Sequence, residues 1–335
     1  MTSKKRATLR DVARLSGVSV ATVSRVMNAP RLVSDTTRTR VEDAIEALRF
    51  RPSAAARAIN SGRSHIVGAL VPTLDNSIFA RFLVGLETQL DTFGLSLIVA
   101  STGDDPGVEL DKARALVDIG AEGLILTGIT HADELHALLN RFELPTIAIS
   151  YHDPNCVLPT VGYDNMAATR VGLEHLRGLG HSRIAILHGP TQHNDRTRAR
   201  VETIKQSTGA TRHAFYEGPI SIETGRDLAR QALNDDFGCT AILCFSDVLA
   251  LGALFELQEQ GVSVPDQMSL MGMENLPSSE HAPVPLTTVD LQVADMGVQA
   301  ANALGQWVSQ DQRPDHTCLH ASLVQRHTTG PAPGT

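Results

Sequence analysis

Short apolar runs alternate with helical segments through most of the chain, and this alternation constrains the fold more than any other feature. The apolar runs cover residues 66–71, 95–100, 123–126, 146–149, 184–187, 241–245 and 268–271. Helical patterns with leucine and alanine faces lie between most of them, for example at residues 82–93, 110–119 and 248–260. Apolar strands that alternate with helices indicate parallel sheets covered on both faces. One small sheet does not need so many residues, so we expect two α/β subdomains with a cleft between them.

Residues 8–50 have a different pattern, which predicts three short helices. Thr8 and Asp11 have the spacing of a capping box, and Gly17 suits the turn that ends the first helix. Ser19 and Ser34 are placed to cap the second and third helices. The residues expected to face inward are Val12, Ala13, Leu15, Val23, Val26, Met27, Val41, Ala44, Ile45 and Leu48. Two helices joined by a short turn that contains glycine predict a helix-turn-helix.

Charge is distributed unevenly along the chain. Residues 1–65 carry 13 Lys and Arg against 5 Asp and Glu, a net charge of +8, within a chain whose total is −8. A basic first segment on an acidic body suggests that only this segment contacts a polyanion. On charge alone, a basic tail that merely improves solubility is the alternative.

An alanine-rich segment, residues 52–62, separates the two patterns. Pro52 suits the first turn of a helix and Gly62 suits its end. So short a segment does not hold a helix alone in water. We therefore expect a linker that becomes helical only when something stabilises it.

Residues 9–25 read LRDVARLSGVSVATVSR, and this run closely resembles the headpiece of the lac-repressor/gal-repressor family. The similarity continues at residues 33–34 and 51–54, and in the core at residues 169–176, 180–181, 246–247 and 285–289. It extends over about residues 7–330. It implies an α-helical helix-turn-helix headpiece plus an α/β periplasmic-binding-protein-like core of two parallel-sheet subdomains. It also implies a homodimer that binds double-stranded DNA, with a small-molecule effector in the cleft.

The resemblance assigns boundaries to these parts. The DNA-binding headpiece covers residues 7–51, the hinge helix or linker 52–63, and the effector-binding core 64–330. Within the core, the N-subdomain covers about 64–163 and 291–321, and the C-subdomain about 164–290 and 322–330.

The second helix is the expected recognition helix, whose first residues meet base edges in the major groove. The resemblance places base contacts at Val20, Ala21 and Arg25, and Arg25 can contact guanine through two hydrogen bonds. Helix packing is the alternative role for Val20 and Ala21, and a phosphate contact is the alternative for Arg25. The expected phosphate contacts are Ser19, Thr22, Ser24 and Asn28.

The hinge is expected to be a second DNA contact. In the family, a leucine from each hinge helix inserts into the minor groove at the operator centre and kinks the duplex, and Ile59 takes that place here. Arg57 is expected beside it, at the backbone or the groove edge. The symmetry of a dimer predicts a near-palindromic operator.

The effector is expected beyond the carboxyl ends of the strands. The residues carried over by resemblance are Asn76, Phe79, Thr127, Asp164, Arg200, Ile220, Ser246, Asp247 and Glu274. Glu274 stands where the family usually has Asp, and Ile220 where many relatives have an aromatic ring. A polar cleft with Arg200 and few aromatics favours an open-chain sugar acid or another carboxylate over a purine or a pyranose, with sugars and related metabolites as further classes.

Other classes of protein fit the sequence less well. An enzyme on the same α/β core is disfavoured, because the chain has no Gly-x-Gly-x-x-Gly, Walker A, Gly-x-Ser-x-Gly or His-Glu-x-x-His motif. We expect no cofactor and no metal site. A plain solute-binding protein is disfavoured because no apolar run follows the basic N-terminus, as a signal peptide requires, and because the headpiece is present.

Cysteine usage and hydropathy indicate the compartment. Cys156, Cys239, Cys244 and Cys318 are scattered, which favours reduced thiols and a cytoplasmic protein. No stretch of about 18 apolar residues predicts a membrane span. No leucine heptad follows the core, so a dimer is favoured over a tetramer. The sequence as a whole predicts a DNA-binding transcriptional regulator, with repression as the family's usual mode.

Overall fold

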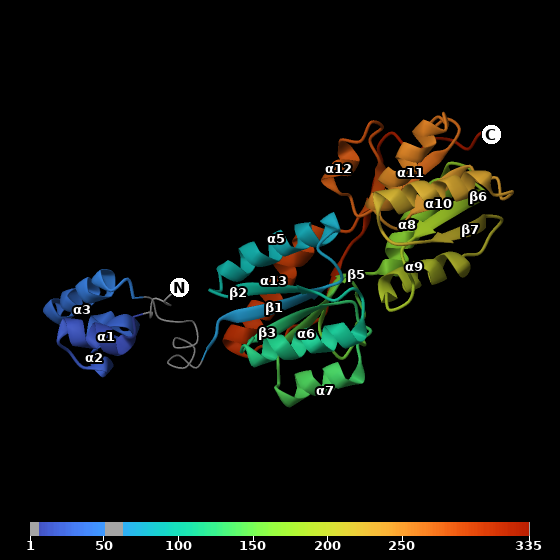
Figure 1. Ribbon diagram of the computed structural model, residues 1–335. Helices are drawn as coiled ribbons and strands as arrows, with labels where there is room; N and C mark the ends of the chain where they lie inside the picture. Colours follow the sequence, from blue (N-terminus) through green and yellow to red (C-terminus); the bar gives the residue numbers. More distant parts are fainter. Residues whose placement is uncertain (1–6, 51–62, 335) are drawn as a thin grey trace. The chain divides into compact units, whose positions relative to one another are not determined.

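The computed structural model describes residues 7–50 and 63–334 (Figure 1). It divides into two compact units, Met1–Ser64 and His65–Thr335. The predicted hinge, with Arg57 and Ile59, lies outside the described residues. Each unit is described below by itself.

The first unit contains α1 (Leu9–Ser16), α2 (Val20–Asn28), the 3-10 helix η1 (Pro30–Leu32) and α3 (Asp35–Ala47). The predicted capping box is present, because Thr8 caps α1 and its backbone N–H donates to the Asp11 carboxylate over 2.9 Å. Gly17 ends α1 at φ 66°, which favours glycine. Ser19 caps α2, whereas the Ser34 hydroxyl donates to Thr37 Oγ1 and makes no capping bond.

A small apolar core holds these three helices together. Its buried members are Val12, Ala13, Val23, Val26, Val41, Ala44 and Phe50. Leu15, which was expected in this core, is 56% exposed. It lies to the side of the α1 face on which Val12, Ala13 and Ser16 are buried, so the prediction for Leu15 was wrong.

The second unit contains two six-stranded sheets, as the alternating pattern predicted. The first has the order β11-β5-β4-β3-β1-β2 and the second β12-β10-β9-β8-β6-β7. Neighbouring strands run parallel, except that β12 is antiparallel to β10. All carboxyl ends of the parallel strands in a sheet therefore lie at one edge, where ligands of such folds bind.

The elements of the first sheet and its helices are β1 (Ile66–Val71), α5 (Ser77–Asp91), β2 (Ser96–Ser101), α6 (Pro106–Asp118), β3 (Gly123–Thr127), α7 (Asp133–Arg141), β4 (Thr146–Ile149), β5 (Thr160–Tyr163), α13 (Val293–Gln310) and β11 (Thr317–Leu319). We call this part the N-subdomain. The elements of the second sheet and its helices are α8 (Asn165–Gly178), β6 (Arg183–His188), α9 (Asp195–Lys205), β7 (Arg212–Glu217), α10 (Ile222–Asn234), β8 (Ala241–Cys244), α11 (Asp247–Glu259), β9 (Ser269–Met273), α12 (Pro277–Glu280), β10 (Thr287–Asp290) and β12 (Ser322–Val324). We call this part the C-subdomain.

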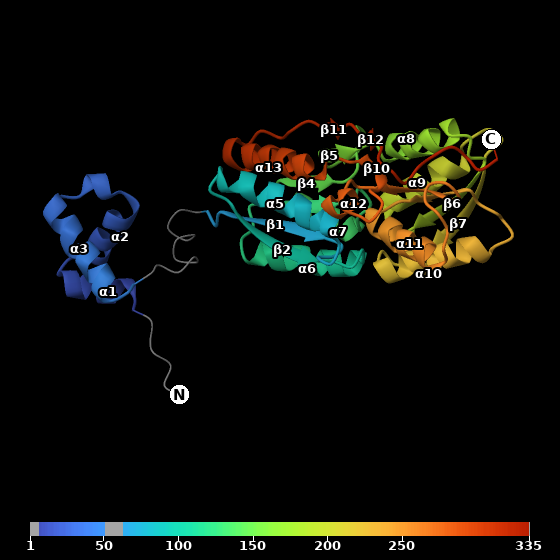
Figure 2. The same cartoon turned by 90° about the horizontal axis from the view of Figure 1, so that it is seen from above.

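The chain passes between the two subdomains at three places. It crosses after β5, returns after β10, and crosses again between β11 and β12. Figure 2 shows α13 beside the first sheet, whose edge strand is β11, with β10 and β12 in the second sheet. The last part of the sequence therefore completes both sheets.

Two glycines bring α5 and α13 of the N-subdomain into close contact. A Cβ atom on Gly85 would lie 2.4 Å from the Ala294 carbonyl oxygen, and one on Gly297 would lie 2.3 Å from that of Phe82. No side chain fits at such distances without moving a helix backbone. The sequence thus requires glycine at this helix crossing.

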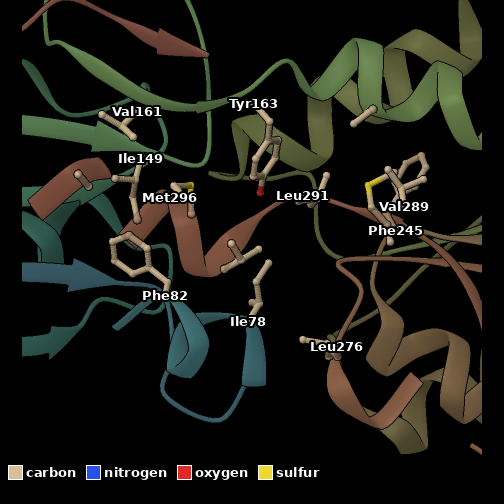
Figure 3. Packing of buried hydrophobic residues seen from close by; sticks show 14 of the residues in the cluster. Ile78, Phe82, Ile149, Val161, Tyr163, Phe245, Leu276, Val289, Leu291 and Met296 are labelled. Atoms are coloured by element: carbon tan, nitrogen blue, oxygen red, sulfur yellow. The ribbon is translucent and has the colours of Figure 1, made fainter. Parts of the chain in front are cut away.

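One buried apolar cluster extends through both subdomains. It includes Phe82 and Val161 of the N-subdomain and Phe245 and Val289 of the C-subdomain. Figure 3 shows Tyr163 among these side chains, near Leu291 in the crossing segments. The two subdomains therefore share one apolar core, and this core holds in place the segments that cross between the two sheets.

All four cysteines lie among the described residues, and none forms a disulfide. Within residues 7–50 and 63–334, no helix combines the length and apolar character needed to cross a bilayer.

Candidate DNA-binding and effector-binding sites

Helix α2 has one buried face and one exposed face. Val23 and Val26 are buried in the headpiece core, whereas Val20 is 43% exposed and Ala21 and Arg25 are also exposed. Ala21 and Arg25 are one helical turn apart, so they lie on the same face. The expected base-reading residues are therefore accessible to a ligand of this unit.

The expected phosphate-binding residues have local roles as well. The Ser19 hydroxyl accepts a hydrogen bond from the Thr22 backbone N–H over 3.1 Å and lies 2.9 Å from Thr22 Oγ1. Ser24 is half-buried. Asn28 is the last residue of α2, and its side chain is not described.

Four of the headpiece arginines show two kinds of environment. Arg14 forms an ion pair with Asp11 at 2.5 Å, and Arg38 forms one with Asp35 at 2.7 Å. Arg10 and Arg25 have no carboxylate within ion-pair distance among the described residues. A guanidinium without an internal partner can neutralise a phosphate without first breaking an ion pair.

A cavity of about 330 Å³ lies between the two subdomains, and we call it the cleft cavity. Of the expected effector residues, those that line it are Asn76, Phe79, Arg200, Ile220 and Glu274. Sequence reasoning missed other polar or aromatic lining residues, namely Thr73, Asp75, Asp104, Ser150, Tyr163, Asn194, Arg196, Thr197 and Phe245. The lining comes from loops at the carboxyl ends of strands in both sheets, as this fold class predicts.

Two expected effector residues are engaged in the local backbone instead. The Thr127 hydroxyl donates to the Leu70 carbonyl over 3.0 Å. The Asp164 carboxylate caps α8 and accepts from the backbone N–H groups of Met166 and Ala167 over 2.8 and 3.0 Å. Neither residue is among those that line the cleft cavity.

Ser246 and Asp247 lie behind the cavity wall. Ser246 caps α11, and its hydroxyl donates to Glu274 Oε2 over 3.0 Å. Asp247 is fully buried and accepts from the hydroxyls of Ser279 and Thr288, both at 2.6 Å, and from the Leu276 N–H at 2.8 Å. Asp247 therefore fixes the loop after β9, which carries Glu274.

Glu274 is a strained and buried acid in the cavity wall. Its φ of 127° is rare for a residue with a side chain, and it is only 4% exposed. Burial, together with the charge of Asp247, raises the pKa of Glu274 to about 8, although Arg200 and the Ser246 hydroxyl oppose the shift. At neutral pH this side chain is mostly a neutral carboxylic acid, which can donate as well as accept a hydrogen bond.

Arg200 is a buried cation in the same wall. It is 6% exposed, and it donates to Asn165 Oδ1 and to the Phe245 carbonyl, both over 2.9 Å. Its guanidinium lies 6.0 Å from the centre of the Tyr163 ring. No carboxylate among the described residues lies within ion-pair distance. A buried charge with only neutral partners favours an anionic ligand.

The described residues contain no group of three or more side chains placed to hold a metal ion. A helix-turn-helix with an exposed reading face, joined in one chain to a cleft with a buried cation, defines a transcriptional regulator that carries a ligand-binding core.

Comparison with known proteins gives the family. A family model described as bacterial regulatory proteins, lacI family, matches residues 8–53. A second, described as periplasmic binding proteins and sugar binding domain of LacI family, matches residues 64–327. The chain therefore belongs to the lacI family of bacterial regulators.

Relatives resemble the chain over almost its whole length. The transcriptional regulator reg1 of Streptomyces lividans is 30% identical, and the alignment covers 97% of each chain. The transcriptional repressor PurR of Actinobacillus pleuropneumoniae is 29% identical, over 96% of this chain and 98% of its own. These relatives are regulators of transcription rather than enzymes.

Solved structures show the same architecture. A lacI-family regulator from Silicibacter pomeroyi superposes with a TM-score of 0.86 at 28% identity, over 96% of this chain and 99% of its own. A lac repressor dimer bound to operator and the anti-inducer ONPF superposes with a TM-score of 0.84 at 27% identity, over 97% of this chain and 100% of its own.

Proposed function

We propose that this protein represses transcription as a homodimer on a near-palindromic operator, and that a small organic acid in the cleft cavity controls its DNA affinity. The observation that carries the proposal is the buried Arg200 without a carboxylate partner, in a chain that also exposes a recognition helix. Such a protein acts in the cytoplasm, where bacterial DNA is found.

The recognition helix supports specific DNA binding. Val20 and Ala21 offer only apolar contacts, which suit thymine methyl groups, and Arg25 can bind guanine through two hydrogen bonds. Ser19, Thr22, Ser24 and Asn28 would contact phosphates, which position the helix without selecting sequence. Arg57 and Ile59 of the hinge remain predicted minor-groove contacts.

Exposed apolar side chains support a dimer. Val84 on α5 is 64% exposed and Leu74 is 57% exposed in the N-subdomain. Ile222 on α10 and Phe255 on α11 are 37% and 38% exposed in the C-subdomain. Contact with a second copy would remove these side chains from water. The lac repressor structure that this chain resembles is a dimer on its operator.

The polarity of the cleft cavity supports an acid that carries hydroxyl groups. Arg200 would hold a carboxylate, while Asn76, Asp75 and neutral Glu274 offer hydrogen bonds to hydroxyls. Phe79 would give apolar contact on one side. An open-chain sugar acid combines these features.

The DNA contact is tested with Arg25→Ala. Binding to a selected operator and to random DNA is measured by fluorescence anisotropy over a range of salt concentrations. We expect a loss of about 1–3 kcal/mol on the operator and a smaller loss on random DNA. Equal losses on both DNAs would show that Arg25 contacts only phosphate. Arg14→Ala is the matched control, because Arg14 is already paired with Asp11.

The effector is tested by calorimetric melting with aldonic and aldaric acids and with the neutral sugars of the same carbon skeleton. An acid at 100 times its dissociation constant stabilises the folded protein by about 2.7 kcal/mol. Arg200→Gln should abolish the shift, and the active acid should change operator affinity. Stabilisation by neutral sugars alone, or no change in operator affinity, would contradict the proposal.

A further inference from the structure

Two charged residues at the start of α9 connect the C-subdomain to the N-subdomain. Asp195 Oδ2 accepts hydrogen bonds from the backbone N–H groups of Ile129 and Thr130 over 2.6 and 2.9 Å. Those residues follow β3 of the N-subdomain. Asp195 is 7% exposed, so these bonds are buried and its carboxylate is fixed.

Arg196 continues the connection. Its guanidinium lies 3.0 Å from Asp195 and 3.0 Å from Asp104, which belongs to the loop after β2 of the N-subdomain. Gly128, at φ 86°, makes room for this arrangement, because a Cβ there would lie 2.5 Å from Arg196 Nη1. The ion pair of Arg196 and Asp104 thus joins the two subdomains, and both residues line the cleft cavity.

Arg196 and Arg200 are four residues apart on α9, so they lie on one face of the helix. Both line the cleft cavity, but their partners differ. Arg200 has only neutral acceptors, whereas Arg196 has two carboxylates. The cavity therefore presents two guanidinium groups about one helical turn apart, and only one of them is matched by an internal anion.

The two partners of Arg196 are not equally fixed. Asp195 is held by two backbone N–H groups in addition to Arg196. The Asp104 side chain is 30% exposed, and the guanidinium of Arg196 is its ion-pair partner. It follows Gly103 in a turn where both residues have positive φ values, 67° and 57°. Asp104 is the partner that can leave.

We propose that Arg196 is a second anion-binding subsite of the cleft cavity, and that the Asp104 carboxylate occupies it when no effector is bound. The effector is then an acid with two anionic groups, one for Arg200 and one that displaces Asp104 from Arg196. This inference rests on the proposed function of the cavity. It also couples binding to the subdomains, because the displacement breaks an ion pair between them.

The test removes the internal carboxylate and supplies an external one. Asp104→Gly leaves room at Arg196, and glycine suits a φ of 57°. The full chain is melted by calorimetry in sodium acetate and in sodium chloride of equal ionic strength. At ten times its dissociation constant, acetate should raise the melting temperature of Asp104→Gly by about 3–6 °C beyond chloride. Wild type, whose Asp104 already occupies Arg196, should gain less from acetate than Asp104→Gly does.

Asp105→Asn is the matched control. It removes the same charge from the neighbouring residue, whose carboxylate caps α6 through the N–H groups of Gly107 and Val108. Asparagine is also a good N-cap, so the helix is retained. If wild type or Asp105→Asn gains as much from acetate as Asp104→Gly does, the proposal is overturned. Acetate bound at Arg200 would act on all three proteins alike.

A second variant guards against a failure of Asp104→Gly to fold. Asp104→Ser keeps a short polar side chain and leaves room for formate, which is tested against chloride in the same way. A saturable formate effect that is larger in this variant than in wild type supports the subsite, and equal effects in the two proteins refute it. The acetate and formate experiments need no DNA. A failure of sugar acids to control operator binding would refute the proposed function, but it would leave the results of the acetate and formate experiments unchanged.

Discussion

The substitution Glu274→Gln removes a buried titratable group from the wall of the cleft cavity. It keeps the size of the side chain and an acceptor for the Ser246 hydroxyl. The pKa of Glu274 rises from an ordinary value of 4.5 to about 8 in the folded protein, chiefly because of burial. Between these values the folded protein holds a proton that the unfolded chain releases. The neutral acid therefore contributes stability that is complete below pH 4.5 and is lost as the pH rises towards 8.

The size of this effect follows from the two pKa values. One pKa unit corresponds to about 1.4 kcal/mol, so the wild type should lose about 3.5 kcal/mol between pH 5 and pH 8 relative to Glu274→Gln. Glutamine is neutral at every pH in this range, so the unfolding free energy of the variant lacks this pH-dependent contribution. For a domain of this size the relative change in melting temperature is about 7–14 °C.

The assay is urea unfolding of wild type and variant at each pH unit from 5 to 8. Their difference in unfolding free energy cancels the titration of all other groups that the two proteins share. Glu280→Gln is the control, because it makes the same substitution at an exposed site in the same subdomain. A difference that stays constant within about 1 kcal/mol across this range would refute the reasoning.

Three other substitutions test the packing. Gly297→Ala should destabilise the core by about 1–3 kcal/mol in urea unfolding, because its Cβ would lie 2.3 Å from a backbone oxygen. The control Gly178→Ala should not destabilise the core, because a Cβ at Gly178 would meet open space. Asp195→Ala should cost about 3–5 kcal/mol, since Arg196 and two backbone N–H groups lose an acceptor, and a cost below about 1 kcal/mol would show that the subdomains do not depend on it. Val23→Ala should lower the melting temperature of the headpiece, followed by circular dichroism, at a cost of about 1–2 kcal/mol, and an unchanged temperature would contradict the assigned core.

The elements that sequence predicted best depend on local chemistry or on uniform burial. Thr8, Asp11 and Gly17 fix the ends of a helix through bonds to their own backbone, so their spacing is sufficient. The strands of the sheet interiors read as continuous apolar runs because both faces are covered. Strand β7 did not stand out, because it lies at the edge of its sheet and carries charged residues at both ends.

The effector residues were harder to predict, for a geometric reason. A residue that follows a strand in the sequence lies at the ligand-binding edge of the sheet. Its place in the sequence does not tell where its side chain points. Asp247 and Glu274 both follow strands of the second sheet, yet Glu274 lines the cavity and Asp247 binds the loop behind it. Arg196 had a usable signal, since it stands four residues before Arg200 on the same helix, and that spacing places both on one face.

The three crossings between the subdomains have a consequence for the order of events during synthesis. The headpiece core is built from residues near the N-terminus, so the headpiece can fold while most of the chain is still being made. The first sheet must wait for α13 and β11, and the second sheet for β12, all of which leave the ribosome last. A chain that stops early at about residue 290 would carry a folded DNA-binding unit and a core with two incomplete sheets. Completion of the last strands is therefore the step at which both sheets of this regulator become whole.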